Sequence, residues 1–147
     1  MDRQLLPLLM ASSKFVDPDE SEALDRLRMQ KGVFLLENRG PTEWRSLYEF
    51  EPYDWGPFSR SLIQDVNQMV VNGQMMTVRF EGFRFWEYQN TEQGELLVED
   101  AVANLEESTV EFVRRIRNYV THRSFSQLLK EVYAAYPDYA VRSRFTG

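Results

Sequence analysis

Residues 59–88, SRSLIQDVNQMVVNGQMMTVRFEGFRFWEY, decide the predicted fold because an amphipathic helix there leads directly into two β-strands. The apolar positions of the helix follow the spacing of one buried face: Leu62, Val66, Met69 and Val70. Gly73 is the expected end of this helix. The residues that follow are dense in β-forming side chains around Glu81-Gly82, which predicts a hairpin with strands at about 75–80 and 83–88.

Capping signals predict further helices on both sides of this unit. The helix before the hairpin can begin at Ser59 or Ser61, and Ser61 with Gln64 fits a capping box. Gly32 lies inside another predicted helix, where it favours a close crossing with a neighbouring helix. The remaining predicted helices are those of residues 5–10 with Pro7 in the first turn, residues 24–39 ended by Gly40-Pro41, one opened by Thr91 and carrying Leu97, Ala101 and Leu105, one capped by Ser108 with Glu111, and one capped by Ser124 with Gln127.

The order of these elements is that of a winged helix: two or three helices, then a helix followed at once by a two-stranded ribbon. We therefore expect a mainly α protein with a small β-hairpin, an α+β fold, in a single domain over residues 1–147. Residues 1–94 are the expected winged-helix core, and residues 95–147 a helical extension packed on it. Residues 44–57 are broken by Pro52 and Pro57 and predict an extended segment entering a turn.

The composition restricts the classes of function. The chain has 147 residues, a formal net charge of −6, no cysteine and one histidine. The negative charge argues against a general polyanion binder, because non-specific affinity for nucleic acids comes from neutralising phosphates. The lack of cysteine excludes disulfides, thiolate nucleophiles and zinc sites built from cysteine and histidine.

The sequence also predicts where the protein acts. The apolar run Leu5–Met10 is too short for a signal peptide, and no stretch approaches the roughly 20 apolar residues of a membrane span. We expect a cytoplasmic protein with no membrane partner.

No motif of an enzyme is present. The chain has no phosphate-binding glycine loop, dinucleotide fingerprint, nucleophile elbow or zinc-protease motif. His122 lies between two predicted helices with no marked carboxylate or nucleophile beside it, and a general base needs both. We expect a non-enzymatic protein that uses no cofactor and no metal.

Three stretches resemble the SocA-like, or Panacea, group of small antitoxin and phage-associated proteins. They are RLRMQKGVFLL (26–36), YEFEPYDWGPFSRSLIQDV (48–66) and YAAYPDYAVRSRF (133–145). Gln30-Lys31 occupies the place of that group's Gln-Lys step, and Trp55-Gly56-Pro57, preceded by Tyr53, the place of its aromatic-x-Gly-Pro bend. YQNTEQG (88–94) is similar to the segment that follows the wing in many winged-helix regulators.

By these stretches the chain resembles a divergent member of the group. The resemblance implies a non-enzymatic interaction protein. Such antitoxins are thought to neutralise a partner toxin by direct binding or to deliver it to a protease. Neighbouring winged-helix families bind DNA and repress transcription. The host process, whether toxin neutralisation, phage defence or a phage structural role, stays open.

Two clusters are candidates for binding a partner protein. The expected wing carries aromatic side chains beside arginine, the combination that protein interfaces concentrate. The following helical region holds the densest basic run, although pairing with acidic residues at 99–111 would also explain it. The candidate partner-binding residues are Arg79, Arg84 and Trp86 on the wing, with Arg114, Arg115 and Arg117.

The alternative function is sequence-specific DNA binding, with a homodimer as the expected form. Arginine can bond guanine, and Asn or Gln can bond adenine, from a helix in the major groove. The same face also fits a solvated or protein-docking surface, and Asp65 at its flank would repel phosphate. The candidate DNA-binding residues are Arg60, Ser61, Gln64, Asn67 and Gln68 on the helix, with Arg79 and Arg84 on the wing.

Overall fold

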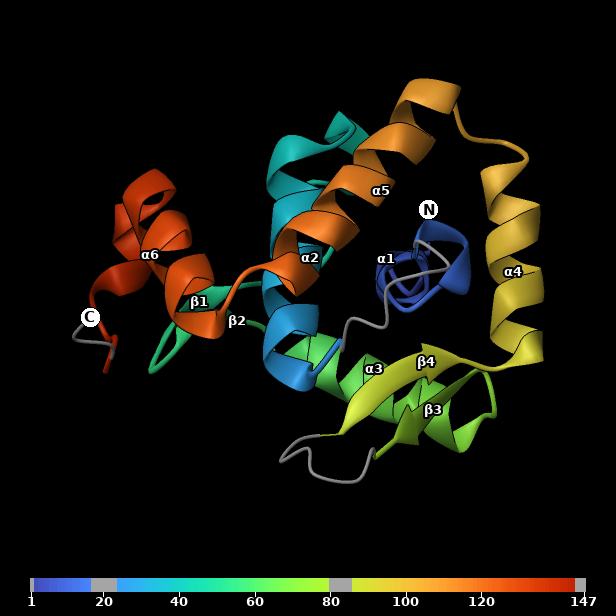
Figure 1. Cartoon of the computed structure of the whole chain (residues 1–147), viewed down its shortest axis with the longest axis horizontal. Coiled ribbons are helices and arrows are strands. Elements are labelled where there is room, and N and C mark those ends of the chain that lie inside the picture. The colour runs from blue at the N-terminus through green and yellow to red at the C-terminus, as the bar shows by residue number, and fades with distance from the viewer. Residues whose placement is uncertain (1, 17–23, 80–85, 145–147) are drawn as a thin grey trace.

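The computed structural model describes residues 2–16, 24–79 and 86–144 (Figure 1). In these ranges the helices are α1 (Leu5–Met10), α2 (Arg26–Arg39), α3 (Arg60–Val71), α4 (Glu92–Val102), α5 (Glu107–His122) and α6 (Phe125–Ala135), with the short 3-10 turns η1 (Ser13–Phe15), η2 (Thr42–Trp44) and η3 (Pro137–Ala140). Two antiparallel sheets pair β1 (Glu51–Tyr53) with β2 (Gly56–Phe58), and β3 (Met75–Val78) with β4 (Glu87–Asn90). The mainly helical α+β fold expected from the sequence is confirmed.

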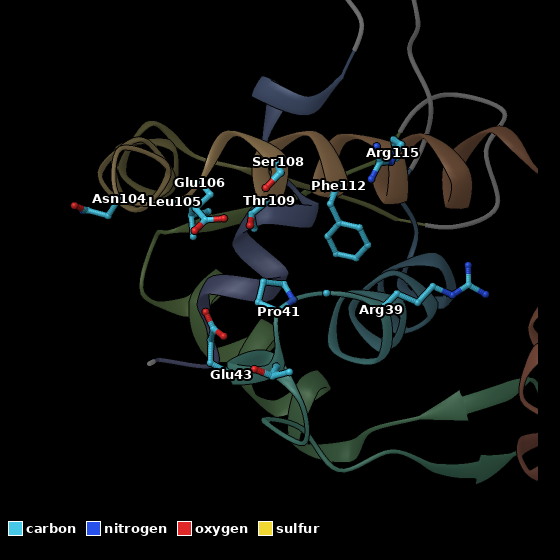
Figure 2. A pocket seen from close by; sticks show the side chains of 12 residues that line it. Arg39, Pro41, Glu43, Asn104, Leu105, Glu106, Ser108, Thr109, Phe112 and Arg115 are labelled. Carbon is cyan, nitrogen blue, oxygen red and sulfur yellow. The ribbon is translucent and has the colours of Figure 1, made fainter.

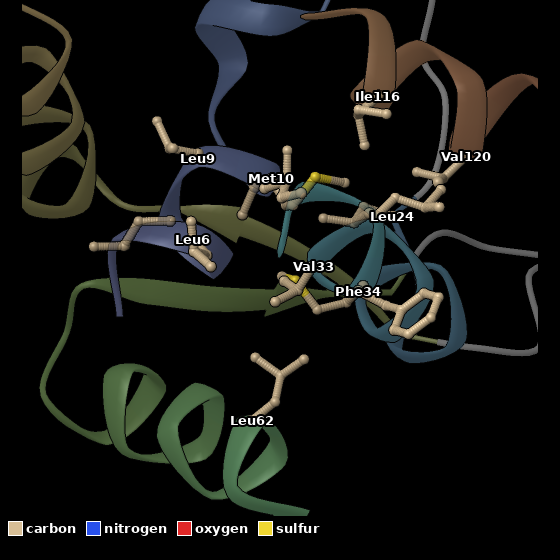
Figure 3. Packing of buried hydrophobic residues seen from close by; sticks show 14 of the residues in the cluster. Leu6, Leu9, Met10, Leu24, Val33, Phe34, Leu62, Ile116 and Val120 are labelled. Carbon is tan, nitrogen blue, oxygen red and sulfur yellow. The ribbon is translucent and has the colours of Figure 1, made fainter. Parts of the chain in front are cut away.

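Helix α2 lies at the centre of the protein. Its residues from Met29 to Glu37 are all buried, and α1, α5, β2 and η2 pack around it. Gly32 lies against the thioether of Met10, with no room for a Cβ atom, so the expected close helix crossing is confirmed and joins α1 to α2. Figure 3 shows how α1, α2, α3 and α5 meet in one core, through Leu6, Leu9, Met10, Val33, Phe34, Leu62, Ile116 and Val120.

The unit of α3, β3 and β4 has the predicted order. Ser59 caps α3 by accepting a hydrogen bond from the Leu62 amide, 3.2 Å away, so the predicted Ser61–Gln64 capping box is wrong. Extended backbone at Ser59 places its hydroxyl at the helix end, whereas Ser61 already lies inside the first turn. Gly73 adopts φ +82° and ends the helix as expected.

The hairpin strands are shorter and shifted relative to the prediction. β3 covers residues 75–78 and β4 residues 87–90, in a register that pairs Met75 with Asn90. The expected turn at Glu81-Gly82 and the aromatic residues Phe80, Phe83 and Phe85 lie outside the described residues.

The segment between α2 and α3 contains a second hairpin. The sequence predicted an extended segment entering a turn, and the structure folds it into β1 and β2, with Gly56 at φ +94°. A helix-turn-helix joins its two helices through three or four residues. Here η2 and the β1–β2 hairpin occupy residues 40–59, so the likeness to a winged helix rests on α3, β3 and β4.

The C-terminal helices pack on the same core as the N-terminal ones. Thr91 and Ser124 cap α4 and α6 as predicted, each by accepting a hydrogen bond from an amide of the first turn. The Ser108–Glu111 capping box is wrong because α5 starts at Glu107, without a side-chain cap. Only one side of α4 is covered, mainly by α1, so Val98 is buried while Leu97 is exposed. Leu105, which was expected on this helix, lies after its last residue, Val102.

We predict that Gly94→Ala destabilises the protein. A methyl group at Gly94 would overlap the main-chain carbonyl of Gln74, which cannot move without shifting β3. The expected loss is about 1–3 kcal/mol in the free energy of unfolding, measured by urea denaturation. Leu96→Ala, on the exposed side of the same helix, is the control and should change stability by less than about 0.5 kcal/mol.

Candidate protein-binding and nucleic-acid-binding surfaces

Arg79 and Trp86 form an exposed pair where the β3–β4 hairpin leaves the core. The ladder that pairs Val78 with Glu87 places the next two residues, Arg79 and Trp86, opposite each other. The Arg79 guanidinium carbon lies 5.7 Å from the centre of the Trp86 ring, within the range of a cation–π contact. Trp86 is 53% exposed. We call these two residues the wing pair; Arg84, predicted to act with them, lies outside the described residues.

The three arginines of α5 do not form one surface. Arg117 is 4% exposed, and its positive charge offsets part of the effect of burial, which raises the pKa of the Glu87 carboxyl. Arg114 contacts Glu111 at 3.5 Å and lies against the ring of Phe15 in η1. Of the three, Arg115 alone is exposed rather than buried or half-buried.

Arg115 lines a groove between the end of α2 and the start of α5. The groove has a volume of about 680 Å³. Figure 2 shows the Phe112 ring reaching from α5 toward Pro41. Arg39 and Arg115 supply positive charge to this groove and Glu43 and Glu106 supply negative charge, so it offers no single-sign field for a polyanion.

The wing pair and this groove lie at opposite ends of α2. β4 lies beside the residues that precede α2, because the Tyr88 amide donates a hydrogen bond to the Leu24 carbonyl at 2.9 Å. The groove is lined from Arg39 to Glu43, after the last turn of α2. The 14 residues of α2 span about 20 Å at 1.5 Å per residue. The structure therefore brings Arg79 and Trp86 together and separates them from Arg115.

The outer face of α3 carries the polar side chains expected for DNA contact. Arg60, Gln64 and Asn67 are exposed and make no hydrogen bond with the part of the chain that the structure describes. Gln68 donates to Asn72 within the helix, at 3.1 Å. Ser61 is half-buried, with its hydroxyl 3.0 Å from that of Ser59.

The charges beside this face differ from the prediction. Asp65 was expected to repel phosphate, but it is bound to Arg3 at 2.9 Å and accepts the Tyr48 hydroxyl at 2.8 Å. Its charge is therefore compensated. Glu49 and Glu51 instead border Arg60 and Gln64 at the start of α3.

Gln30 of α2 fixes the chain at the start of α3. Its side-chain amide donates to the Ser59 carbonyl at 2.9 Å, and its oxygen accepts from the Ser59 amide at 2.8 Å. Both polar atoms of the buried amide and both polar groups of one main-chain residue are thus satisfied. We call this pair of hydrogen bonds the Gln30 clamp.

Lys31, next to this clamp, is 1% exposed. Among the described residues its ammonium makes no hydrogen bond or ion pair, and it lies 5.9 Å from the centre of the Phe125 ring. Burial lowers the pKa of Lys31 to about 7, and the nearby Asp25 charge offsets only part of this effect. Glycine at position 56 leaves room for the lysine, because a Cβ atom there would lie only 3.0 Å from the Lys31 Cε. Trp55, exposed on the same bend, has its ring 6.3 Å from that of Phe125.

Glu37 is a second buried ionisable group on α2, and the sequence analysis did not single it out. Its carboxylate accepts the Tyr48 amide at 2.9 Å, and burial raises the pKa of Glu37 to about 7. Only the tertiary packing reveals this residue, since α2 has no continuous polar face that would mark it as buried.

His122 has a local role. Its Nδ1 lies 2.8 Å from the Asn118 carbonyl, one turn earlier in α5. Within residues 2–16, 24–79 and 86–144, no group of acidic and histidine side chains could hold a metal ion. None of the helices described is both long enough and apolar enough to cross a membrane.

The comparison with known proteins does not assign the chain to a family. No protein-family model matches the chain, and no curated protein is significantly similar to it.

We predict opposite pH dependences from Glu37 and Lys31. The folded-state pKa of Glu37 lies above its unfolded value of 4.5, so stability falls as pH rises from about 4.5 to 7. The folded-state pKa of Lys31 lies below its unfolded value of 10.5, so stability rises as pH increases from about 7 to 10.5. The free energy of unfolding, measured in urea across this range, should therefore pass through a minimum near neutral pH.

Two variants separate these contributions. Lys31→Met removes the desolvated ammonium and should stabilise the protein at pH 6 by roughly 2–4 kcal/mol, since one pKa unit corresponds to about 1.4 kcal/mol. This gain should shrink toward pH 10.5. Glu37→Gln should remove the slope below pH 7 and leave the slope above it. A gain from Lys31→Met that does not change with pH would contradict the assignment.

Proposed function

We propose that this protein is a non-enzymatic interaction protein, of the antitoxin or adaptor kind, that binds a partner protein through the wing pair. The partner is a toxin to be neutralised or a client to be delivered to a protease. The observation that carries the proposal is the half-exposed Trp86 with the Arg79 guanidinium against its ring.

The chemistry of the wing pair supports a protein partner. Trp and Arg are the residues most enriched among those that dominate binding energy in protein interfaces. A large aromatic ring in water loses the free energy that burial would give, and a partner surface supplies that burial. The guanidinium keeps donors free for a carboxylate while it lies on the ring. The net charge of −6 also favours a protein partner over nucleic acid.

The interface is smaller than the sequence suggested. Arg117 is buried and Arg115 lies about one α2 length away, so the proposed interface excludes both. Arg114, engaged with Glu111 and Phe15, is also left out. The wing pair remains, and Arg84, the third residue predicted there, lies outside the described residues.

We predict that Trp86→Ala weakens partner binding by about 30-fold or more, the size of a residue that dominates an interface. Arg79→Glu should weaken it as well, because it reverses the charge and removes the cation–π contact. The partner is first captured from nuclease-treated host lysate with the wild-type protein, and affinities are then measured by calorimetry with the purified partner.

The control for this experiment is Leu96→Ala, which truncates another exposed apolar side chain on a different element. Circular dichroism should show that all three variants fold. Unchanged affinity in both Trp86→Ala and Arg79→Glu would exclude the wing pair as the interface.

A second candidate function is sequence-specific DNA binding by α3. It is favoured by the three exposed side chains without partners among the described residues, Arg60, Gln64 and Asn67. Glu49 and Glu51 at the start of the helix oppose it, because they would face the phosphates on either side of a groove. We therefore rank it second.

If α3 reads DNA, Asn67→Ala should relax specificity at one base pair by about 1–3 kcal/mol and leave the others unchanged. Selection from a random DNA library, followed by binding measurements between 50 and 200 mM salt, tests this directly. Affinity for the selected site should fall steeply with salt. Failure to enrich any sequence, or an affinity that salt does not change, would rule this function out.

A further inference from the structure

A small cavity lies beside the Gln30 clamp, between the start of α2, the β1–β2 hairpin and α3. Its volume is about 260 Å³. An engineered protein cavity of about 150 Å³ holds a benzene molecule, so this one has room for one aromatic ring with a short substituent. Its aromatic walls come from the hairpin: Tyr53, Trp55 and Phe58.

The walls of the cavity are suited to a flat apolar group. The rings of Tyr53 and Phe58 stack on each other at 5.0 Å with an interplanar angle of 27°, and the Arg142 guanidinium lies 5.5 Å from the centre of the Tyr53 ring, so this pair forms a fixed apolar wall. Leu27 and Ile63 complete the lining from α2 and α3. Tyr53 and Trp55 are also partly exposed, which leaves the cavity accessible from solvent.

Lys31 is a buried polar group of this cavity that has bonding capacity left. Gln30 also lines it, but the clamp on Ser59 uses both of its amide atoms. The Lys31 amine is almost completely buried and has no hydrogen bond or ion pair within the described part of the chain. A buried amine of this kind costs stability unless a partner arrives, and the apolar walls supply none.

From this arrangement we infer that the cavity is a binding site for an aromatic carboxylate, with the ring packed against the hairpin aromatics and the carboxylate on Lys31. The carboxylate satisfies the amine that the fold leaves without a partner, and the ring fills the apolar space. Because burial lowers the pKa of Lys31 to about 7, the unliganded amine holds its proton weakly, and a bound anion would stabilise the ammonium. Arg26, exposed at the edge of the cavity, adds a second positive charge on the path of entry.

This inference is independent of the proposed partner interface, because none of the residues lining the cavity belongs to the wing pair. An aromatic carboxylate can be a free small molecule or the C-terminal aromatic residue of a polypeptide. Both present the same ring and anion, and the experiment distinguishes them.

The experiment uses the full chain and follows binding by calorimetry and by the fluorescence of Trp55. The probe is phenylacetate, with phenylacetamide as its uncharged match. In the wild-type protein phenylacetate should bind at least about tenfold more tightly than phenylacetamide, since a charge-assisted hydrogen bond forms only with the anion. In Lys31→Met the two should bind equally.

Lys31→Met is a suitable variant because its unbranched side chain is only one atom shorter and it removes a group whose burial costs stability. Its folding is checked by urea denaturation. Trp86→Ala serves as the matched control and should bind phenylacetate as the wild type does. Trp55→Phe should lose the fluorescence change but retain the heat of binding.

A tripeptide ending in phenylalanine, with a free or an amidated C-terminus, identifies the source of the ligand. Tighter binding of the free-acid peptide than of phenylacetate supports the end of a polypeptide, and the reverse order supports a small molecule. Absence of binding at millimolar phenylacetate would overturn the inference. So would equal binding of phenylacetate and phenylacetamide to the wild type, or a preference for the anion that survives in Lys31→Met.

Discussion

The Gln30 clamp on Ser59 is the constraint on which the rest of the structure depends. Two hydrogen bonds of 2.8 and 2.9 Å join the buried centre of α2 to the residue where β2 ends and α3 begins. Ser59 in turn caps α3, and α3 leads into β3. One side chain therefore sets where the β1–β2 hairpin closes and where the helix that supports the wing starts. A neighbouring position on α2 could not do this, because its side chain would leave the helix in another direction.

The polar side chains in the buried part of α2 differ in how they are satisfied. Gln30 has main-chain partners for both its nitrogen and its oxygen, so its burial costs little. Glu37 accepts the Tyr48 amide, but burial still raises its pKa to about 7. Lys31 differs from both, since its amine gains only an aromatic ring at 5.9 Å. Unsatisfied polarity in this helix is thus concentrated at one position, beside the cavity lined by Tyr53, Trp55 and Phe58. The absence of a Cβ at Gly56 leaves the space that the end of the lysine fills.

The fold distributes charge and exposed aromatic surface in a way that separates three regions. The wing pair lies near the start of α2, the mixed-charge groove near its end, and the polar face of α3 beside Glu49 and Glu51. Each region has its own chemistry, and the distance along α2 keeps the first two from acting as one interface. An acidic protein can bind different partners through separate surfaces of this kind, because local basic or aromatic patches decide binding more than net charge does.

The sequence by itself determined the order of helices, the β3–β4 hairpin after α3 and the close contact at Gly32. It also determined the caps at Thr91 and Ser124, and it offered Ser59, the actual cap of α3, beside Ser61. These features are local, because spacing, capping and turn chemistry act over a few residues. The sequence missed the start of α5 at Glu107, the β1–β2 hairpin and the burial of Arg117. It also marked Gln30, Lys31 and the Trp55-Gly56-Pro57 bend without revealing that they meet. Only the tertiary structure decided these points, because burial and pairing between distant segments depend on how whole elements pack.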